Sequence, residues 1–353
     1  MRPEDLVRPE ILALKAYPVP SSDGMVKLDA MENPYPLPDS VKRELAAALA
    51  RVDMNRYPTP SPRNLREAIV RRMNVPAGME VLLGNGSDEL IQMLITALAR
   101  PGAALMYPSP TFVMYSMGAT FSGMRAVAVP LREDFSLDAD AFIARMQAEK
   151  PALVFLAYPN NPTGVLYPEP DVVKIIRACK GLVVMDEAYQ PFASRDSLHR
   201  LERHAHVLLM RTMSKFGLAG LRVGYLIGRR EVIAEIEKLR PPFNVGVLNA
   251  EAALFALEHE AEYRRQAAVI RAEREGLQQA LKALPGVTPF PSEANMILAR
   301  VPDAKRAFEG MKARGVLVKN IATLHPLLAN CLRLTVGTPD ENTQMIAALK
   351  ASL

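Results

Sequence analysis

The sequence contains little cysteine, no long hydrophobic run and no large excess of charge of one sign. The two cysteines, Cys179 and Cys331, are too few for a disulfide framework and lack the spacing of a metal site. The chain contains no run of about 18 apolar residues, the length needed to span a membrane. Its first residues include acidic ones and do not resemble a secretory signal peptide. We therefore expect a cytoplasmic protein that binds neither a metal ion nor a membrane.

The charge balance is mildly basic, with 43 lysine and arginine side chains against 38 aspartate and glutamate side chains. The basic residues are spread along the chain among acidic ones, whereas nucleic-acid-binding proteins gather them on one face or tail. This pattern favours a small anionic ligand over a nucleic acid. The 353 residues, 49% of them hydrophobic, are enough for a large packed unit with a smaller appendage.

Six short apolar runs alternate with helical patterns through the first two thirds of the chain. They are apolar throughout, as expected for parallel strands that are covered by helices on both faces. The alternation predicts an α/β fold, with a three-layer large domain around a mostly parallel, doubly wound sheet. The predicted strands cover residues 80–83, 103–107, 126–129, 152–157, 182–185 and 207–210.

The C-terminal part has a different pattern, which predicts a smaller α+β domain. Residues 246–283 favour one long helix, and short strands are expected at 295–300 and 332–336. The proline-punctuated residues 1–28 are expected to pack against this domain. The predicted boundaries are therefore 29–262 for the large domain, and 1–28 together with 263–353 for the small one.

Polar residues follow the carboxyl ends of several predicted strands, which is where open α/β sheets bind ligands. Residues 84–88, Gly-Asn-Gly-Ser-Asp, precede a helix and fit either a phosphate site at its N-terminus or a tight turn with an ordinary cap. In residues 158–164, the Asn161 amide could donate to a ligand oxygen or serve only the turn.

Asp186 directly follows the apolar run 182–185. Because burial of an unpaired charge is costly, this carboxylate needs a partner: a metal ion, an arginine or a protonated ring nitrogen. The Asp-Glu-Ala string also resembles the second nucleotide motif of ATPases. That interpretation fails because the chain has no Gly-x-x-x-x-Gly-Lys-[Ser/Thr] loop.

Lys215 lies among small and apolar residues, with Thr212 and Ser214 before it and Arg222 after it. Two hydroxyls and a guanidinium are suitable phosphate ligands. The residues alone leave three roles open for Lys215: a loop cation, a further phosphate ligand, or a nucleophile whose pKa is lowered by its surroundings.

In this order and spacing, these segments resemble fold-type I pyridoxal-phosphate aminotransferases, and most of all the histidinol-phosphate aminotransferase family. The likeness covers nearly the whole chain. It rests on residues 28–35, 55–60, 84–89, 110–115, 158–164, 186–189, 214–215 with Arg222, and 331–337.

The resemblance implies roles around pyridoxal 5'-phosphate. Lys215 would hold the cofactor covalently and then move a proton between the substrate and the cofactor. Asp186 would keep the ring nitrogen protonated, and Asn161 and Tyr189 would hydrogen-bond the ring oxygen. Phe112 would stack on the ring, at a position where many relatives have tyrosine.

The resemblance also implies a phosphate site and a homodimer. The cofactor phosphate would be bound by Ser87, Asp88, Thr212, Ser214 and Arg222. Tyr57 would reach the same phosphate from the partner subunit, so that a complete site requires a homodimer.

The substrate side follows from the same resemblance. Arg333 would bind the phosphate of one substrate and the carboxylate of the other, since both anions accept a bidentate arginine. Tyr17 and Lys319 would assist, although Lys319 also fits a solvated surface lysine. The implied reaction transfers the amino group of L-histidinol phosphate to 2-oxoglutarate, giving imidazole acetol phosphate and glutamate in histidine biosynthesis. The alternative is the same scaffold acting on aromatic amino acids, or decarboxylating a phospho-amino acid.

Overall fold

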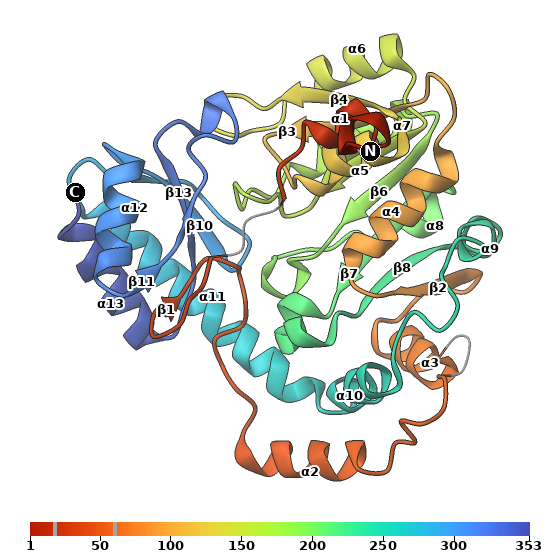
Figure 1. The fold of residues 1–353 in the computed structure, drawn as a ribbon, viewed down its shortest axis with the longest axis horizontal. Coiled ribbons are helices and arrows are strands. Elements are labelled where there is room, and N and C mark those ends of the chain that lie inside the picture. Colours follow the sequence, from red (N-terminus) through yellow and green to blue (C-terminus); the bar gives the residue numbers. More distant parts are fainter. Residues whose placement is uncertain (17–19, 59–61) are drawn as a thin grey trace.

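The structure is a computed structural model that describes residues 1–16, 20–58 and 62–353 (Figure 1). Tyr17 therefore lies outside the described residues, and its predicted role stays a prediction.

A seven-stranded sheet forms the centre of the larger unit, in the order β2-β8-β7-β6-β5-β3-β4. Strands β3 to β7 pair in parallel, whereas β8 is antiparallel to both β7 and β2. All six predicted strands are present, and the mostly parallel sheet is confirmed. The strands are β2 (Met79–Gly84), β3 (Ala104–Ser109), β4 (Arg125–Pro130), β5 (Leu153–Ala157), β6 (Leu182–Asp186), β7 (Val207–Thr212) and β8 (Gly224–Arg229).

Strand β8 was not predicted, because its two glycines interrupt any apolar run. At Gly224 the sheet passes so close to residues 86–87 that a Cβ atom there would lie 2.7 Å from the backbone nitrogen of Ser87. A side chain at this position would therefore push the start of the following helix away from the sheet.

Helices cover both faces of this sheet and bury two apolar layers (Figure 1). The central strands β5, β6 and β7 are almost entirely buried, as their unbroken apolar sequences predict. One face is covered by α4 (Ser87–Leu98), α5 (Met114–Ser122) and α9 (Arg230–Glu237). The other is covered by α3 (Arg63–Arg72), α6 (Ala139–Glu149), α7 (Glu169–Ala178), α8 (Arg200–Arg203) and α10 (Val247–Glu258).

The outermost strand, β4, does not match the expected burial on both faces. It lies at the edge of the sheet, and Val127 and Val129 are buried while their neighbours are exposed. Only one face of this edge strand is covered, so the prediction was wrong there.

A four-stranded antiparallel sheet, in the order β12-β13-β10-β9, forms the smaller C-terminal unit. Its core is closed by the three C-terminal helices. Helix α13 begins with a capping box in which Thr338 and Glu341 satisfy each other's backbone N–H groups. The elements are α11 (Glu260–Lys282), β9 (Thr288–Pro289), β10 (Met296–Arg300), α12 (Ala304–Ala313), β11 (Val316–Leu317), β12 (Lys319–Asn320), β13 (Cys331–Thr335) and α13 (Pro339–Lys350).

The expected single helix over 246–283 is two helices, α10 and α11, which are divided at His259. The break carries no glycine or proline and so leaves no local signal in the sequence. The His259 ring lies stacked on Phe255 at the end of α10, with 4.0 Å between the ring centroids.

The N-terminal segment contacts both units. Strand β1 (Val26–Lys27) pairs in parallel with β11 of the small unit. Further upstream, the Arg8 guanidinium donates to the carbonyl oxygen of Phe121, at the end of α5 in the large unit. The domain boundaries stay a prediction.

The remaining elements are short or lie at the periphery. Helix α2 lies apart from the sheets at the bottom of Figure 1. No helix in the described part of the chain is both long and apolar enough to cross a membrane. The short or peripheral elements are α1 (Pro9–Leu12), α2 (Asp39–Leu49) and the helical turns Pro3–Asp5, Gln190–Phe192, Ser214–Leu218, Ala219–Leu221 and Pro326–Leu328.

Candidate active site

A cavity of about 120 Å³ lies at the carboxyl ends of β5, β6 and β7, where the polar residues of the predicted site were expected. We call it the Lys215 cavity. It brings together most of the predicted site, although the segments involved are far apart in the chain. It is lined by Met31, Ser87, Asp88, Phe112, Ala157, Pro159, Asn161, Asp186, Ala188, Tyr189, Thr212, Ser214, Lys215 and Arg222.

The Lys215 amine projects into this cavity from the helical turn that follows β7. Its Nζ donates to the carbonyl oxygen of Ala30 at 2.8 Å and lies 5.8 Å from the centre of the Tyr189 ring. Burial, with a smaller effect from the nearby Arg333 cation, lowers the pKa of Lys215 to about 7. A large fraction of the amine is therefore neutral and nucleophilic at neutral pH.

Asp186 ends strand β6 and is only 5% exposed. One carboxylate oxygen accepts from the Tyr115 hydroxyl at 2.6 Å, and the other accepts from the Ala188 N–H at 3.1 Å. Burial raises the pKa of Asp186 to about 6. Among the described residues it has no cationic partner, so it can receive a positively charged ligand atom.

Hydroxyl and guanidinium groups gather on the other side of the cavity. The Thr212 hydroxyl donates to the Ser214 hydroxyl at 3.0 Å, and the Arg222 guanidinium donates to Ser214 at 3.2 Å and to Asp88 at 3.2 Å. Arg222 has a left-handed backbone (φ +51°), which is unusual for a residue other than glycine. Gly86 makes room for it, since a Cβ there would lie 2.7 Å from Nη2 of Arg222.

These groups surround the N-terminus of the 12-residue helix α4, whose first residues are Ser87 and Asp88. Free N–H groups at a helix start, two hydroxyls and an arginine together form a suitable phosphate site.

Arg333 on β13 is 8% exposed and adjoins the cavity through Asn161. Its guanidinium donates to the Asn161 side-chain oxygen at 2.9 Å and to the carbonyl oxygen of Asp29 at 2.7 Å. Because the oxygen of Asn161 accepts from Arg333, its amide nitrogen is the group that could donate to a ligand, and that role stays a prediction.

Besides Arg333, two described residues of the predicted site lie outside the cavity lining. Lys319 is directly opposite Arg333 in the β12–β13 pair, which places the two side chains on the same face of the small sheet. Tyr57 is 81% exposed and stacks on Phe243, with 4.8 Å between the ring centroids. A single chain thus does not bring Tyr57 into its own cavity.

Residues 23–349 match the family model described as aminotransferase class I and II. The chain belongs to this family. It is 59% identical to the histidinol-phosphate aminotransferase of Methylibium petroleiphilum, over 98% of this chain and 94% of the relative. It is 55% identical to histidinol-phosphate aminotransferase 2 of Cupriavidus pinatubonensis, over 99% and 97% of the two chains.

A solved structure agrees with the fold of this aminotransferase. The histidinol-phosphate aminotransferase of Sinorhizobium meliloti, in complex with pyridoxal-5'-phosphate, superposes with a TM-score of 0.84 at 25% identity. The match covers 98% of this chain and 96% of that one.

The charged and hydrogen-bonding groups of the Lys215 cavity fit pyridoxal phosphate by their chemistry. A buried amine with a lowered pKa suits a covalent bond to an aldehyde, and a buried carboxylate without a cation suits a protonated ring nitrogen. The hydroxyls, Arg222 and the start of α4 suit the phosphate. Within the described ranges, no group of three or more His, Cys, Asp or Glu side chains is arranged to hold a metal ion.

Phe112 and Tyr115 form an aromatic wall beneath the site. Phe112 lines the cavity and meets Tyr115 edge to face, with 5.8 Å between the ring centroids. Sequence reasoning missed the contact of Tyr115 with Asp186. The available signal was a tyrosine in an apolar helix, three residues after the predicted stacking residue.

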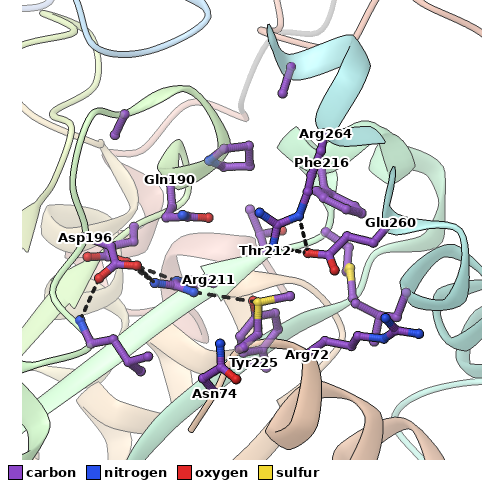
Figure 2. Close-up of a pocket in the computed structure, with 18 of the residues that line it drawn as sticks. Arg72, Asn74, Gln190, Asp196, Arg211, Thr212, Phe216, Tyr225, Glu260 and Arg264 are labelled. Atoms are coloured by element: carbon purple, nitrogen blue, oxygen red, sulfur yellow. Dashed lines mark hydrogen bonds and ion pairs between the residues drawn. The ribbon is translucent and has the colours of Figure 1, made fainter. Parts of the chain in front are cut away.

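A second cavity of about 370 Å³, which we call the Arg211 cavity, lies next to the first and shares Thr212 with it (Figure 2). On its floor the Arg211 guanidinium donates to Glu187 at 2.8 and 3.0 Å and to Asp196 at 3.1 Å. No local pattern in the sequence indicates this pairing, because its members are separated along the chain. The labelled lining residues are Arg72, Asn74, Gln190, Asp196, Arg211, Thr212, Phe216, Tyr225, Glu260 and Arg264.

Proposed function

We propose that the protein is a pyridoxal-phosphate-dependent aminotransferase that transfers the amino group of L-histidinol phosphate to 2-oxoglutarate in histidine biosynthesis. The assignment of the substrate rests on the 59% identity, over nearly the full chain, to a relative named for this reaction. The Lys215 cavity supports the chemistry, because an amine, a buried carboxylate and phosphate-binding groups line the same cavity. The two buried free thiols, Cys179 and Cys331, agree with a reducing cytoplasm.

When bound, pyridoxal phosphate supplies a ring that withdraws electrons from the substrate's Cα–H bond. Asp186 would hold a proton on the ring nitrogen. Asn161 and Tyr189 would donate to the ring oxygen, and Phe112 would pack against the ring. The Lys215 amine would accept and return the substrate proton, since its lowered pKa allows both directions near neutral pH.

Arg333 has to receive two different anions in the two half-reactions. Its guanidinium is held by Asn161 and Asp29 at the edge of the cavity, so it is positioned before the substrate arrives. Both a phosphate and a carboxylate can accept its fork of N–H donors. Lys319, on the same face of the small sheet, adds a second positive charge for the doubly charged phosphate.

Tyr57 completes the site from a second subunit in this proposal. Its exposed ring and its stacking on Phe243 support a role outside its own cavity. A mixture of Tyr57→Ala and Lys215→Ala subunits tests this, because each hybrid dimer contains one site without either change. Recovery of activity on mixing is expected, and its absence would count against the shared site.

The substrate is tested by single-turnover absorbance of the bound cofactor. Histidinol phosphate should convert the cofactor fully, whereas phenylalanine and threonine phosphate should react slowly. No conversion with histidinol phosphate would overturn the proposal, and fast conversion with phenylalanine would favour the aromatic alternative. Release of carbon dioxide from threonine phosphate would favour the decarboxylase.

Arg333→Ala tests the shared anion site, with Arg306→Ala, an exposed arginine of α12, as the matched control. The KM for histidinol phosphate and for 2-oxoglutarate should both rise, because both substrates lose the same contact. A rise for only one of them would contradict the double role.

A further inference from the structure

The Tyr115 hydroxyl contacts Asp186, although Tyr115 itself does not line the Lys215 cavity. The phenol is fully buried in α5, and its ring is stacked on Phe155 with 4.4 Å between the centroids and 6° between the planes. This packing points the hydroxyl at Oδ2 of Asp186, at 2.6 Å. The distance is typical of an O–H group that donates to a carboxylate.

Tyr115 remains a donor at every working pH. Burial, followed by the charge of Asp186, raises the pKa of this phenol well above its usual value. A tyrosine that never ionises cannot repel the carboxylate and always offers its proton to it.

The two hydrogen bonds to Asp186 fix the plane of its carboxylate. Tyr115 binds Oδ2, and the Ala188 N–H binds Oδ1. A carboxylate has about four lone-pair positions, so positions on the cavity side stay available for a ligand. The donors thus orient the group and favour its ionised form without neutralising its charge.

We propose that Tyr115 is a positioning residue that keeps Asp186 ionised and aimed at the ring nitrogen of the cofactor. This inference rests on the proposed function, since it requires that the Lys215 cavity binds the pyridine ring. It assigns to Tyr115 a role in cofactor affinity and electronics that packing alone would not explain, because a phenylalanine would fill the same space.

The test is Tyr115→Phe, with Tyr107→Phe as the matched control. Tyr107 belongs to the same apolar layer, 6.1 Å from Tyr115 between ring centroids, and is not among the described hydrogen-bond donors to Asp186. Both changes remove one hydroxyl oxygen and keep an aromatic ring. Thermal unfolding of each apoprotein shows that the variants are folded.

The readout is the equilibrium affinity of each apoprotein for pyridoxamine 5'-phosphate. This probe carries an amine in place of the aldehyde, so it binds without a covalent bond to Lys215. Tyr115→Phe should weaken binding at pH 7 by roughly 10-fold or more, the typical effect of a lost hydrogen bond to a charged group. Tyr107→Phe should leave the affinity unchanged.

The pH dependence separates positioning from packing. In the wild-type protein, the affinity should fall as the pH drops through the pKa of Asp186, near 6, because the protonated acid no longer accepts from the ring nitrogen. Loss of the Tyr115 donor raises that pKa, so the fall should begin at a higher pH. A purely structural role would lower the affinity equally at all pH values.

The Asp186→Asn background provides the decisive control. If Tyr115 acts through the charge of Asp186, removing its hydroxyl should matter much less where that charge is already absent. An equal loss of affinity in both backgrounds, or no loss in the wild-type background, would overturn the inference. Failure of the wild-type apoprotein to bind the probe would instead overturn the proposed function.

Discussion

Two adjacent carboxylates at the end of β6 have opposite surroundings. Asp186 lines the Lys215 cavity, while Glu187 lines the Arg211 cavity, because successive side chains of a strand point to opposite sides. Glu187 is 1% exposed and bound to Arg211, whereas Asp186 is also buried but has only neutral donors in the described structure.

Two buried basic residues that follow β6, Arg211 and Lys215, show the same contrast. Burial alone would lower the pKa of Arg211, but the nearby Glu187 carboxylate more than offsets it, so the pKa is raised. Lys215 forms no ion pair with the described residues, and burial lowers its pKa to about 7. The protein therefore pairs Arg211 with Glu187 in the Arg211 cavity, whereas Asp186 and Lys215 form no ion pair in the described part of the Lys215 cavity.

The largest expected effect is the loss of the unpaired amine. Lys215→Ala should lower kcat by about 10⁴-fold, because the proton-transfer group is lost. Borohydride should no longer fix the cofactor to the chain. Stability of the apoprotein should not fall, since the amine has no ion pair to lose. The control is Lys238→Ala, which removes an exposed lysine paired with Glu235. Continued borohydride fixation in Lys215→Ala would refute the assignment.

Removal of a paired charge should lower stability more than kcat, which is the reverse of the effect of Lys215→Ala. Arg211→Met leaves Glu187 buried without its partner and should lower the free energy of unfolding by about 3–5 kcal/mol. Urea unfolding measures this loss, and adding Glu187→Gln should restore part of it. The kcat of the folded fraction should change far less than in Lys215→Ala. A comparable loss of kcat would show that the Arg211 cavity takes part in the chemistry.

The sharpest test of the contrast compares Asp186→Asn with Glu187→Gln. Asp186→Asn should lower kcat/KM by roughly 10²–10³-fold, the usual cost of removing one electrostatic group from a reaction centre. Burial raises the pKa of Asp186 to about 6, so above pH 6 its charge destabilises the folded apoprotein relative to the unfolded chain.

Asp186→Asn should therefore leave the apoprotein at least as stable as the wild type at pH 8, as thermal unfolding would show. Glu187→Gln should destabilise it at the same pH, because Arg211 loses its charged partner. If both changes destabilised the apoprotein equally, the two carboxylates would not differ in the way that their surroundings indicate.

The cofactor side of the site could be predicted because its residues carry local signals. Asp186, Asn161 and the Thr212–Lys215 segment directly follow apolar runs, and parallel strands bring such positions to one edge of the sheet. The structure places all of them in one cavity. Their chemical roles came from the family resemblance, since the residues alone left Lys215 open between three interpretations.

The remaining features depend on tertiary contacts that leave no local pattern. The Arg211–Glu187 pair and the Tyr115–Asp186 bond join residues that are far apart in the chain. Strand β8 is masked by two glycines, of which Gly224 is required by the close approach to residues 86–87. The break between α10 and α11 comes without a helix-breaking residue.

The smallest expected effect, a shift in pH dependence, tests whether burial is what makes Lys215 reactive. The rate at which the apoprotein captures pyridoxal phosphate covalently, measured by stopped-flow absorbance, should rise about 10-fold per pH unit and level off above pH 7, when the amine is neutral. An ordinary lysine, with a pKa near 10.5, would continue to gain reactivity beyond pH 9. Arg333→Met removes the second cause of the shift, so its plateau should begin at a higher pH but still far below that of an ordinary lysine. If the plateau moved all the way to that of an ordinary lysine, the neighbouring charge rather than burial would account for the neutral amine.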